Sequence, residues 1–329
     1  VGVFGKMSQY RVKETNHKIR YFRSNTDDPD IIMDGGKRKP LLPIHQAQLF
    51  EELENHNHAY YLMFLFALYT GARLQTVLTL RIKYFRGCRR DNDSYALIPY
   101  GNGSEVDGKQ NKRGTLWVPN WLVNSLLTYV ESDVARSRRE HSYYGDNDEN
   151  YIFLTRSGEA YYTSMKEMLD KQSDEIDSRV VVQRAKTSTN KEGEAIGVFI
   201  RETLRPTLEG KYGYFPHFSF HDLRATFGIN LIEKIYTAID KANLIRREKG
   251  QSLHLYEGAL REVTKRMNHN DEMTTRKYVA FRDRSEWRKQ MIDSYEDSLL
   301  GGIDLSGVED IVLNGCLAHI GQFNGVSDD

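Results

Sequence analysis

Apolar side chains are nearly continuous over residues 60–69, the longest such run in the chain. A run that is apolar on every side predicts a buried helix, and this one is too short to cross a bilayer. Gly71 follows and allows the left-handed turn that ends helices, so the next helix is expected over residues 73–80. Apolar spacing predicts one or two helices over residues 159–180, and further helices at residues 46–54, 121–139, 200–209, 221–241, 257–267, 273–281 and 284–299.

Strands are expected in two short segments, residues 95–100 and 115–118. The segment between them is rich in glycine and lysine, which predicts that the two strands pair as a hairpin. Residues 152–154 are expected as a brief strand or turn. Because helical patterns dominate, the sequence predicts an α+β fold that is mainly α-helical with a small antiparallel β-sheet.

The chain divides into three parts by composition. Polar residues and breakers, including Gly35 and Gly36, dominate residues 1–39, which we expect to form a poorly structured arm or linker. The main domain is expected over residues 40–299, with Pro43 near the start of its first helix. Residues 300–329 are expected to form a tail that docks either on a neighbouring subunit or on its own domain.

Charge and cysteine content limit the partners and the compartment. The 329 residues include 46 Lys and Arg and 46 Asp and Glu, so the net charge is zero. Binding of nucleic acid would therefore depend on a local basic face. Cys88 and Cys316 lack the spacing of a metal site or disulfide, and no signal peptide is visible, so a reducing cytoplasm is expected.

Three separated segments contain side chains that suit the chemistry of a phosphodiester. Alone, Arg73 would be explained by a salt bridge, and His221 with Arg224 by a solvated helix face. Tyr278, nine residues after His269, would alone be an ordinary core tyrosine. Together they supply two permanent cations, two imidazoles and a hydroxyl nucleophile. The combination predicts cleavage of a DNA strand by a tyrosine.

These segments resemble the motifs of a known family. Residues 67–81, 220–227 and 268–278 resemble, in this order, the first arginine box, the histidine–arginine box and the last box of the tyrosine recombinases, the phage-integrase and Xer-like site-specific recombinases. Residues 108–119 are similar to the hairpin that holds that family's catalytic lysine. The likeness covers roughly residues 40–295, and the three boxes together are far more specific than the hairpin.

The resemblance implies a role for each side chain. Arg73, His221, Arg224 and His269 would stabilise negative charge on the phosphate while Tyr278 attacks it. The product would be a 3′-phosphotyrosine, which conserves the energy of the bond, so religation needs no cofactor, metal or ATP.

The family's lysine protonates the departing 5′-oxygen. We assign this role to Lys109, with Lys112 as the alternative, because slippage within a loop leaves both open. A solvated hairpin tip would also explain either lysine.

Several positions depart from the family pattern. Thr76 stands where an acidic residue usually orients the box histidine, so His221 is expected to be held more weakly or by another group. Ala225 replaces a common second histidine, and the intervals before His221 and before His269 are longer than usual. The second interval includes Arg246 and Arg247, for which a solvated charge run is the simplest explanation. The small DNA-clamping domain of the family has no room within residues 1–39.

The sequence therefore predicts a site-specific DNA recombinase or integrase of a mobile genetic element. The resemblance implies that it acts as a dimer to tetramer on double-stranded recombination-site DNA, in the cytoplasm at the nucleoid and without a membrane. Two alternatives remain open. One is a type IB topoisomerase-like enzyme, which would relax plasmid DNA without a special site. The other is a non-catalytic DNA-binding accessory factor, consistent with Thr76 and the zero net charge.

Overall fold

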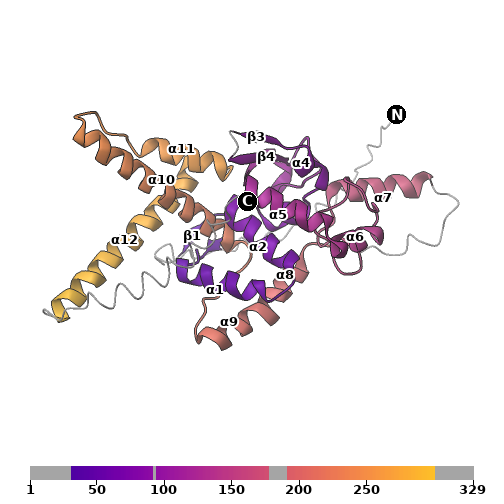
Figure 1. Cartoon of the computed structure of the whole chain (residues 1–329), viewed down its shortest axis with the longest axis horizontal. Coiled ribbons are helices and arrows are strands. Elements are labelled where there is room, and N and C mark those ends of the chain that lie inside the picture. The colour runs from indigo at the N-terminus through magenta and orange to yellow at the C-terminus, as the bar shows by residue number, and fades with distance from the viewer. Residues whose placement is uncertain (1–30, 92–93, 178–190, 301–329) are drawn as a thin grey trace, which may run out of the picture.

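The computed structural model describes residues 31–91, 94–177 and 191–300 (Figure 1). Within these ranges the chain is mainly helical, with one two-stranded and one three-stranded antiparallel sheet. The α+β fold class expected from the sequence is confirmed. The terminal tail after residue 300 and part of the helical region predicted over residues 159–180 lie outside the described residues.

Helix α2 (His58–Thr70) lies at the centre of the molecule and is the buried helix predicted from the longest apolar run (Figure 1). It ends at Gly71, whose φ of 66° is left-handed, as expected. A Cβ at Gly71 would lie 2.5 Å from the Phe227 ring, so glycine also permits close packing there. Helices α1 (Pro43–Glu54), α3 (Leu74–Leu78) and α4 (Ile82–Arg86) surround α2.

The larger sheet has strand order β3–β4–β5. Strands β4 (Tyr95–Tyr100) and β5 (Gly114–Pro119) pair antiparallel, so the predicted hairpin is confirmed. Strand β3 (Arg89–Asp91) was not predicted, because its polar sequence has no apolar alternation. A 3-10 turn, Lys109–Asn111, lies in the β4–β5 connection.

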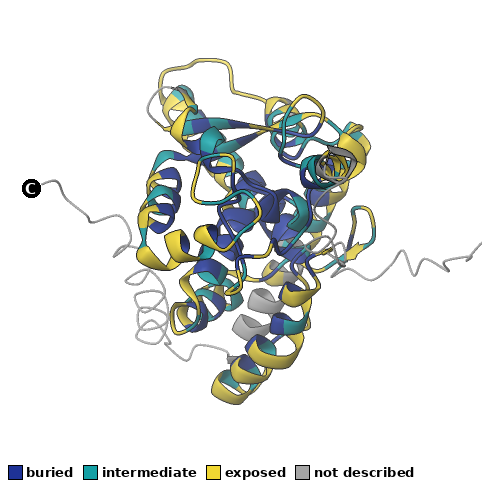
Figure 2. Cartoon of the chain, turned by 90° about the vertical axis from the view of Figure 1, so that its right-hand side faces the viewer, coloured by how far each residue is buried: buried dark blue, intermediate teal, exposed yellow. Residues whose placement is uncertain are grey.

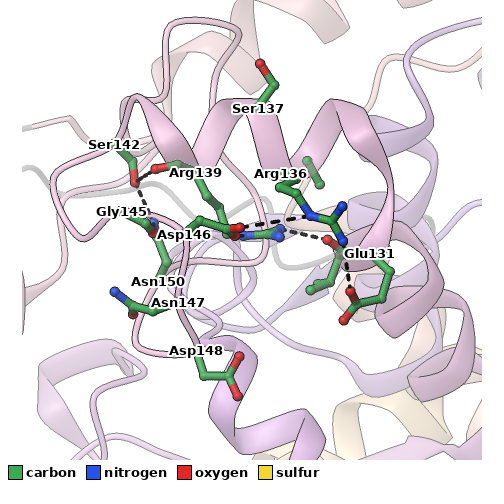
Figure 3. A network of polar contacts seen from close by, with 12 residues as sticks. Glu131, Arg136, Ser137, Arg139, Ser142, Gly145, Asp146, Asn147, Asp148 and Asn150 are labelled. Atoms are coloured by element: carbon green, nitrogen blue, oxygen red, sulfur yellow. Dashed lines mark hydrogen bonds and ion pairs between the residues drawn. The ribbon is translucent and has the colours of Figure 1, made fainter.

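Helices α5 (Asn120–Glu131) and α6 (Asp133–Glu140) replace the single helix expected over residues 121–139. Ser132 separates them because its side chain accepts the Ala135 amide and caps α6. Below them, a polar network joins α6 to the loop that follows it (Figure 3). In this network Arg139 Nε donates to Asp146 at 2.6 Å.

The middle of the chain continues with α7 (Met165–Asp177) and α8 (Glu194–Phe199). One π-helical segment, Ile200–Leu204, joins α8 to α9 (Arg205–Tyr212). The helix predicted over residues 200–209 is thus part of a longer helical stretch.

Three C-terminal helices follow, and α10 (Asp222–Glu248) and α12 (Glu272–Leu300) project from one side of the body (Figure 1). Helix α11 (Glu257–Arg266) packs against both. Helix α10 was expected to end near residue 241, but it continues for about two more turns into the long interval before His269. The two helices predicted after residue 273 are one continuous helix, because no breaker separates them.

The last residues of the expected N-terminal arm are ordered, which corrects the prediction of little structure there. Strands β1 (Ile32–Met33) and β2 (Lys37–Arg38) form a tight hairpin. Asp34, Gly35 and Gly36 make its turn, and the two glycines have φ values of 63° and 143°. The Asp-Gly pair favours such turns, because Asp and Gly tolerate turn conformations at low cost.

Buried residues gather in the middle of the body, whereas the outer part of α10, residues 233–248, is mostly exposed (Figure 2). A large core surrounds α2, and a smaller cluster joins Ile32 of the hairpin to α10, α11 and α12. Tyr278 belongs to this smaller cluster. Among the described helices, none is both long and apolar enough to span a membrane.

Candidate active site

Arg73 lies at the N-terminal end of α3, directly after the turn that ends α2. It lines a hollow of about 260 Å³ together with Asp34, Lys109, His221 and Arg224. Burial and the nearby charge of Arg224 lower the pKa of Arg73, while the charge of Asp34 opposes this shift. Two cations held this close create a strong local preference for an anion.

Arg224 connects the three sequence boxes physically. It lies in the first turn of α10 and is 7% exposed. Its Nη1 donates to the Gly71 carbonyl at 2.6 Å, and its Nη2 donates to the Met267 carbonyl. Its Nε has no hydrogen-bond partner and lies 3.6 Å from Asp34 Oδ2. The guanidinium therefore fixes the loop before α3 against the loop before α12, and still has a donor directed into the hollow.

His221 stands immediately before α10 and faces the same hollow. The following residue, Asp222, fixes this turn, because its carboxylate accepts the Ser219 amide at 2.7 Å and the Lys39 amide at 2.9 Å. Burial, then the charges of Arg38 and Arg73, lowers the pKa of His221. A neutral imidazole at this position can donate or accept a proton near neutral pH. Thr76, which stands at the position of the family's usual acidic residue, is buried in α3.

Tyr278 lies in the second turn of α12 and is completely buried. Its ring packs against Gly228 of α10, where a Cβ would lie 2.6 Å from Tyr278 Cε1. The His269 ring is 5.7 Å from the Tyr278 ring, and His269 Nδ1 lies 2.9 Å from the Thr275 hydroxyl. Thr275 thereby orients the imidazole so that Nε2 is directed toward Asp34, 3.4 Å away.

Both candidate lysines lie on the β4–β5 connection, at different depths. Lys112 Nζ donates to the Asn268 carbonyl at 2.7 Å, next to the loop before α12. Burial and the charges of Arg73 and Arg224 lower the pKa of Lys112, which makes it a better proton donor. Lys109 is exposed and lines the rim of the hollow. The geometry brings both lysines to the cluster.

Asp34 is the site residue that the sequence analysis missed. The Tyr278 hydroxyl donates to Asp34 Oδ2 at 2.8 Å. Burial would raise the pKa of Asp34, but its contacts with His269, Arg224 and Tyr278 lower it well below the usual range. Burial and the Asp34 charge together raise the pKa of Tyr278. The Asp34-Gly35 hairpin signal was present in the sequence, although nothing in it indicated what the turn would touch.

All six predicted site residues therefore lie around Asp34 and the hollow that it lines: Arg73, Lys109, His221, Arg224, His269 and Tyr278. The cluster is rich in cations and hydrogen-bond donors, and Asp34 is the carboxylate that contacts them. Across residues 31–91, 94–177 and 191–300, no group of three or more His, Cys, Asp or Glu side chains is arranged to hold a metal ion. The site can bind an anion beside a phenol.

Comparisons with known proteins give matches only among solved structures. No family model and no curated protein matches the chain. The XerH site-specific recombinase bound to palindromic difH substrate is 14% identical, with a TM-score of 0.41, over 78% of this chain and 52% of that one. The XerA recombinase is 16% identical, with a TM-score of 0.42, over 76% of this chain and 64% of that one.

A third similar structure is the Tn1549 transposon integrase in complex with circular intermediate DNA. It is 13% identical, with a TM-score of 0.43, over 73% of this chain and 61% of that one. The chain thus spans between about half and two thirds of the length of these three proteins. At such low identities and TM-scores, the function of this chain has to be argued from its own residues.

Proposed function

We propose that this protein is a tyrosine-type site-specific DNA recombinase or integrase that cuts and rejoins strands through a 3′-phosphotyrosine. One observation supports this most strongly. Arg224 bonds to the backbone of both Gly71 and Met267, so the three motif segments meet around the Tyr278 hydroxyl. Arg224 also lines the same hollow as Arg73, so two permanent cations face one space that an anion could enter.

The proposed reaction exchanges one phosphorus–oxygen bond for another. The Tyr278 oxygen attacks the phosphorus, and the bond to the 5′-oxygen breaks as the bond to tyrosine forms. Arg73 and Arg224 stabilise the negative charge on the non-bridging oxygens, because they remain charged and can each donate twice. The phenol proton has to leave as this bond forms, and we assign its acceptance to His269, whose ring lies 5.7 Å from the Tyr278 ring.

His221 supplies a further directional donor to the phosphate. Its lowered pKa keeps the imidazole neutral near neutral pH, so it can donate one proton without adding a third permanent charge. Thr76 cannot orient His221 as a carboxylate would. We propose that the backbone turn fixed by Asp222 positions the imidazole instead.

A lysine ammonium protonates the departing 5′-oxygen. Lys109 was the choice from sequence, and the lowered pKa of Lys112 now favours Lys112 as an equal candidate. A substrate with sulfur in place of the 5′-oxygen distinguishes them, because a thiolate leaves without a proton. The true acid is the lysine whose alanine variant regains its activity on the sulfur substrate.

The substrate class is double-stranded DNA, and we propose that a dimer to tetramer assembles on the recombination site of a mobile genetic element. The test is a covalent complex that survives SDS. Nicked duplexes tiled across the DNA that flanks the coding sequence trap such a complex, because the short fragment that carries the newly freed 5′-hydroxyl diffuses away after cleavage. The wild-type protein should form it on a subset of duplexes.

Tyr278→Phe should abolish the adduct, and Tyr236→Phe should leave it unchanged. Tyr236 is a matched control because its ring packs against the same smaller core cluster. An adduct that persists in Tyr278→Phe would exclude Tyr278 as the nucleophile. Relaxation of supercoiled plasmid without any special site would replace the recombinase by a topoisomerase-like enzyme, and tight binding without an adduct would indicate an accessory factor.

A further inference from the structure

The hairpin of residues Ile32–Arg38, called the Asp34 hairpin below, enters the candidate active site from outside the three motif segments. Its tight turn is closed by a 3.1 Å hydrogen bond from the Asp34 amide to the Gly36 carbonyl. The left-handed φ of Gly35 suits glycine, and this turn directs the Asp34 side chain into the cluster. Strand β1 lies against α12, the helix of Tyr278 (Figure 1).

The contacts of Asp34 are the contacts that a scissile phosphate needs. Its Oδ2 accepts the Tyr278 hydroxyl at 2.8 Å and lies 3.4 Å from His269 Nε2. The same oxygen lies 3.6 Å from Arg224 Nε, the donor that has no hydrogen-bond partner. One carboxylate oxygen thus occupies the point where nucleophile, imidazole and guanidinium converge. A phosphodiester oxygen cannot share that point, because both groups are anions.

Asp34 does not activate Tyr278 in this arrangement. A general base needs a proton affinity close to that of the group it deprotonates. The pKa of Asp34 lies far below the usual range, and the pKa of Tyr278 is raised by burial and by Asp34 itself. The hydrogen bond therefore keeps the proton on the phenol, so the nucleophile is held in its unreactive form.

The Asp34 hairpin is held on two sides by few contacts. On one side Ile32 is buried in the smaller core cluster, and Lys277 Nζ donates to the Met33 carbonyl at 3.1 Å. On the other side the Lys39 and Leu41 amides are bonded to α10 side chains at 2.9 Å. The chain is thus tied to α10 by backbone hydrogen bonds from Lys39 onward, whereas the hairpin before it is held by the Ile32 side chain, the Lys277 bond and the contacts of Asp34 itself.

We propose that the Asp34 hairpin is an autoinhibitory element whose carboxylate occupies the position of the scissile phosphate until a DNA phosphodiester displaces it. The proposal rests on the proposed function, because it takes the cluster to be a phosphodiester site. A tethered carboxylate competes at an effective concentration on the order of millimolar. A small free anion therefore binds poorly, while duplex DNA gains many additional phosphate contacts and displaces the hairpin.

Binding of inorganic phosphate tests the proposal without any cleavage. Titration calorimetry compares the wild type with Asp34→Asn, and with Asp34→Ala in case an asparagine still fills the site. We expect both variants to bind phosphate at least about tenfold more tightly than the wild type, since the tethered competitor is lost. Thermal melts verify that each variant is folded.

Glu54→Gln is the matched control, because Glu54 is an exposed carboxylate in α1 that does not line the hollow. This change alters the net charge of the protein equally but frees no donor in the cluster, so its phosphate affinity should remain near that of the wild type. Equal affinity in all four proteins, a gain in Glu54→Gln as large as in Asp34→Asn, or no phosphate binding to either Asp34 variant would overturn the proposal.

Adduct formation on the nicked duplexes gives the second readout. Asp34→Asn should form the adduct about tenfold faster than the wild type at limiting DNA, because the preceding displacement step is removed. A slower or absent adduct in Asp34→Asn, with a normal adduct in the wild type, would make Asp34 a positioning or catalytic group and overturn autoinhibition. If no protein forms an adduct, the proposed function fails, and the phosphate titration still decides whether Asp34 occludes an anion site.

Discussion

Arg139 on the one hand, and Arg73 with Arg224 on the other, have opposite surroundings in this molecule. Arg139 in α6 is 4% exposed, and its charge is met by Asp146 at 2.6 Å and by the Val130 carbonyl at 2.8 Å (Figure 3). Arg73 and Arg224 lie close enough that the charge of Arg224 lowers the pKa of Arg73. Their region contains two histidines and two lysines as well, and the carboxylate that contacts the cluster belongs to the Asp34 hairpin.

The difference lies in where the counter-charge comes from. Around Arg139 it comes from the loop and helix that the arginine itself connects, so the charges hold local structure together. Around Arg224 it comes from a short hairpin that is anchored by few contacts and can leave. Burying cations without a permanent partner is unfavourable. A cluster that does so is therefore expected to bind an external anion, and the predictions below test this contrast.

The largest effect is expected for Arg73→Ala. Loss of one preorganised donor to the phosphate should slow adduct formation by about 100- to 1,000-fold. The free energy of unfolding should change little or increase, because burial and the charge of Arg224 oppose the ionised form of Arg73. Single-turnover adduct formation and urea unfolding measure the two quantities. A large loss of stability with an unchanged rate of adduct formation would mean that Arg73, like Arg139, stabilises the fold and takes no part in the reaction.

Arg139→Ala should show the reverse pattern. Asp146 and the Val130 carbonyl lose their donor, so the free energy of unfolding should fall by about 2–3 kcal/mol. The rate of adduct formation per folded molecule should equal that of the wild type, since α6 contributes nothing to the hollow. A rate that falls in parallel with stability would contradict the separation between the two sets of arginines.

Much of this site could be predicted because its signals are local. The apolar run that forms α2 and the glycine that ends it place Arg73, and the motif segments place the other groups on helix starts. The β4–β5 hairpin was predictable from its two strand segments and its glycine-rich connection. The break at Ser132 was missed, because a single capping side chain interrupts an otherwise helical pattern.

Asp34 could not have been placed by the same reasoning. It lies 244 residues from Tyr278 along the chain, and periodicity reports only neighbours within a few turns. The Asp-Gly pair indicates a turn but not the surface on which the turn docks. The contact depends on Ile32, which the polar composition of the arm concealed, packing into the cluster of α10, α11 and α12. Two chains whose N-terminal segments have the same polar composition can therefore differ in whether that segment extends from the domain or packs into its site.

Gly228→Ala probes the packing that positions the nucleophile. A Cβ there would lie 2.6 Å from Tyr278 Cε1, so the ring must shift. A displacement of this size should slow adduct formation by about ten- to a hundredfold. Gly210→Ala is the matched control, because nothing lies within 4 Å of its Cβ position in α9. That variant should keep the wild-type rate and gain up to about 1 kcal/mol of stability. Equal rates for both variants would show that Tyr278 tolerates movement.

The smallest effect is expected for the pH dependence of stability, which tests whether Asp34 is docked as an ion. The pKa of Asp34 is lowered by His269, Arg224 and Tyr278, although burial opposes this, so its ionised form stabilises the folded state. That contribution is present above the unfolded-state pKa of about 3.9 and is lost as the pH falls toward the lower folded-state value. The difference in unfolding free energy between the wild type and Asp34→Asn should therefore be constant from about pH 7 to 5 and shrink below about pH 4. Taking the difference cancels the titration of the other carboxylates. A difference that stays constant to the acid limit would mean that Asp34 is not held by these cations, and the contrast with Arg139 would then lose its basis.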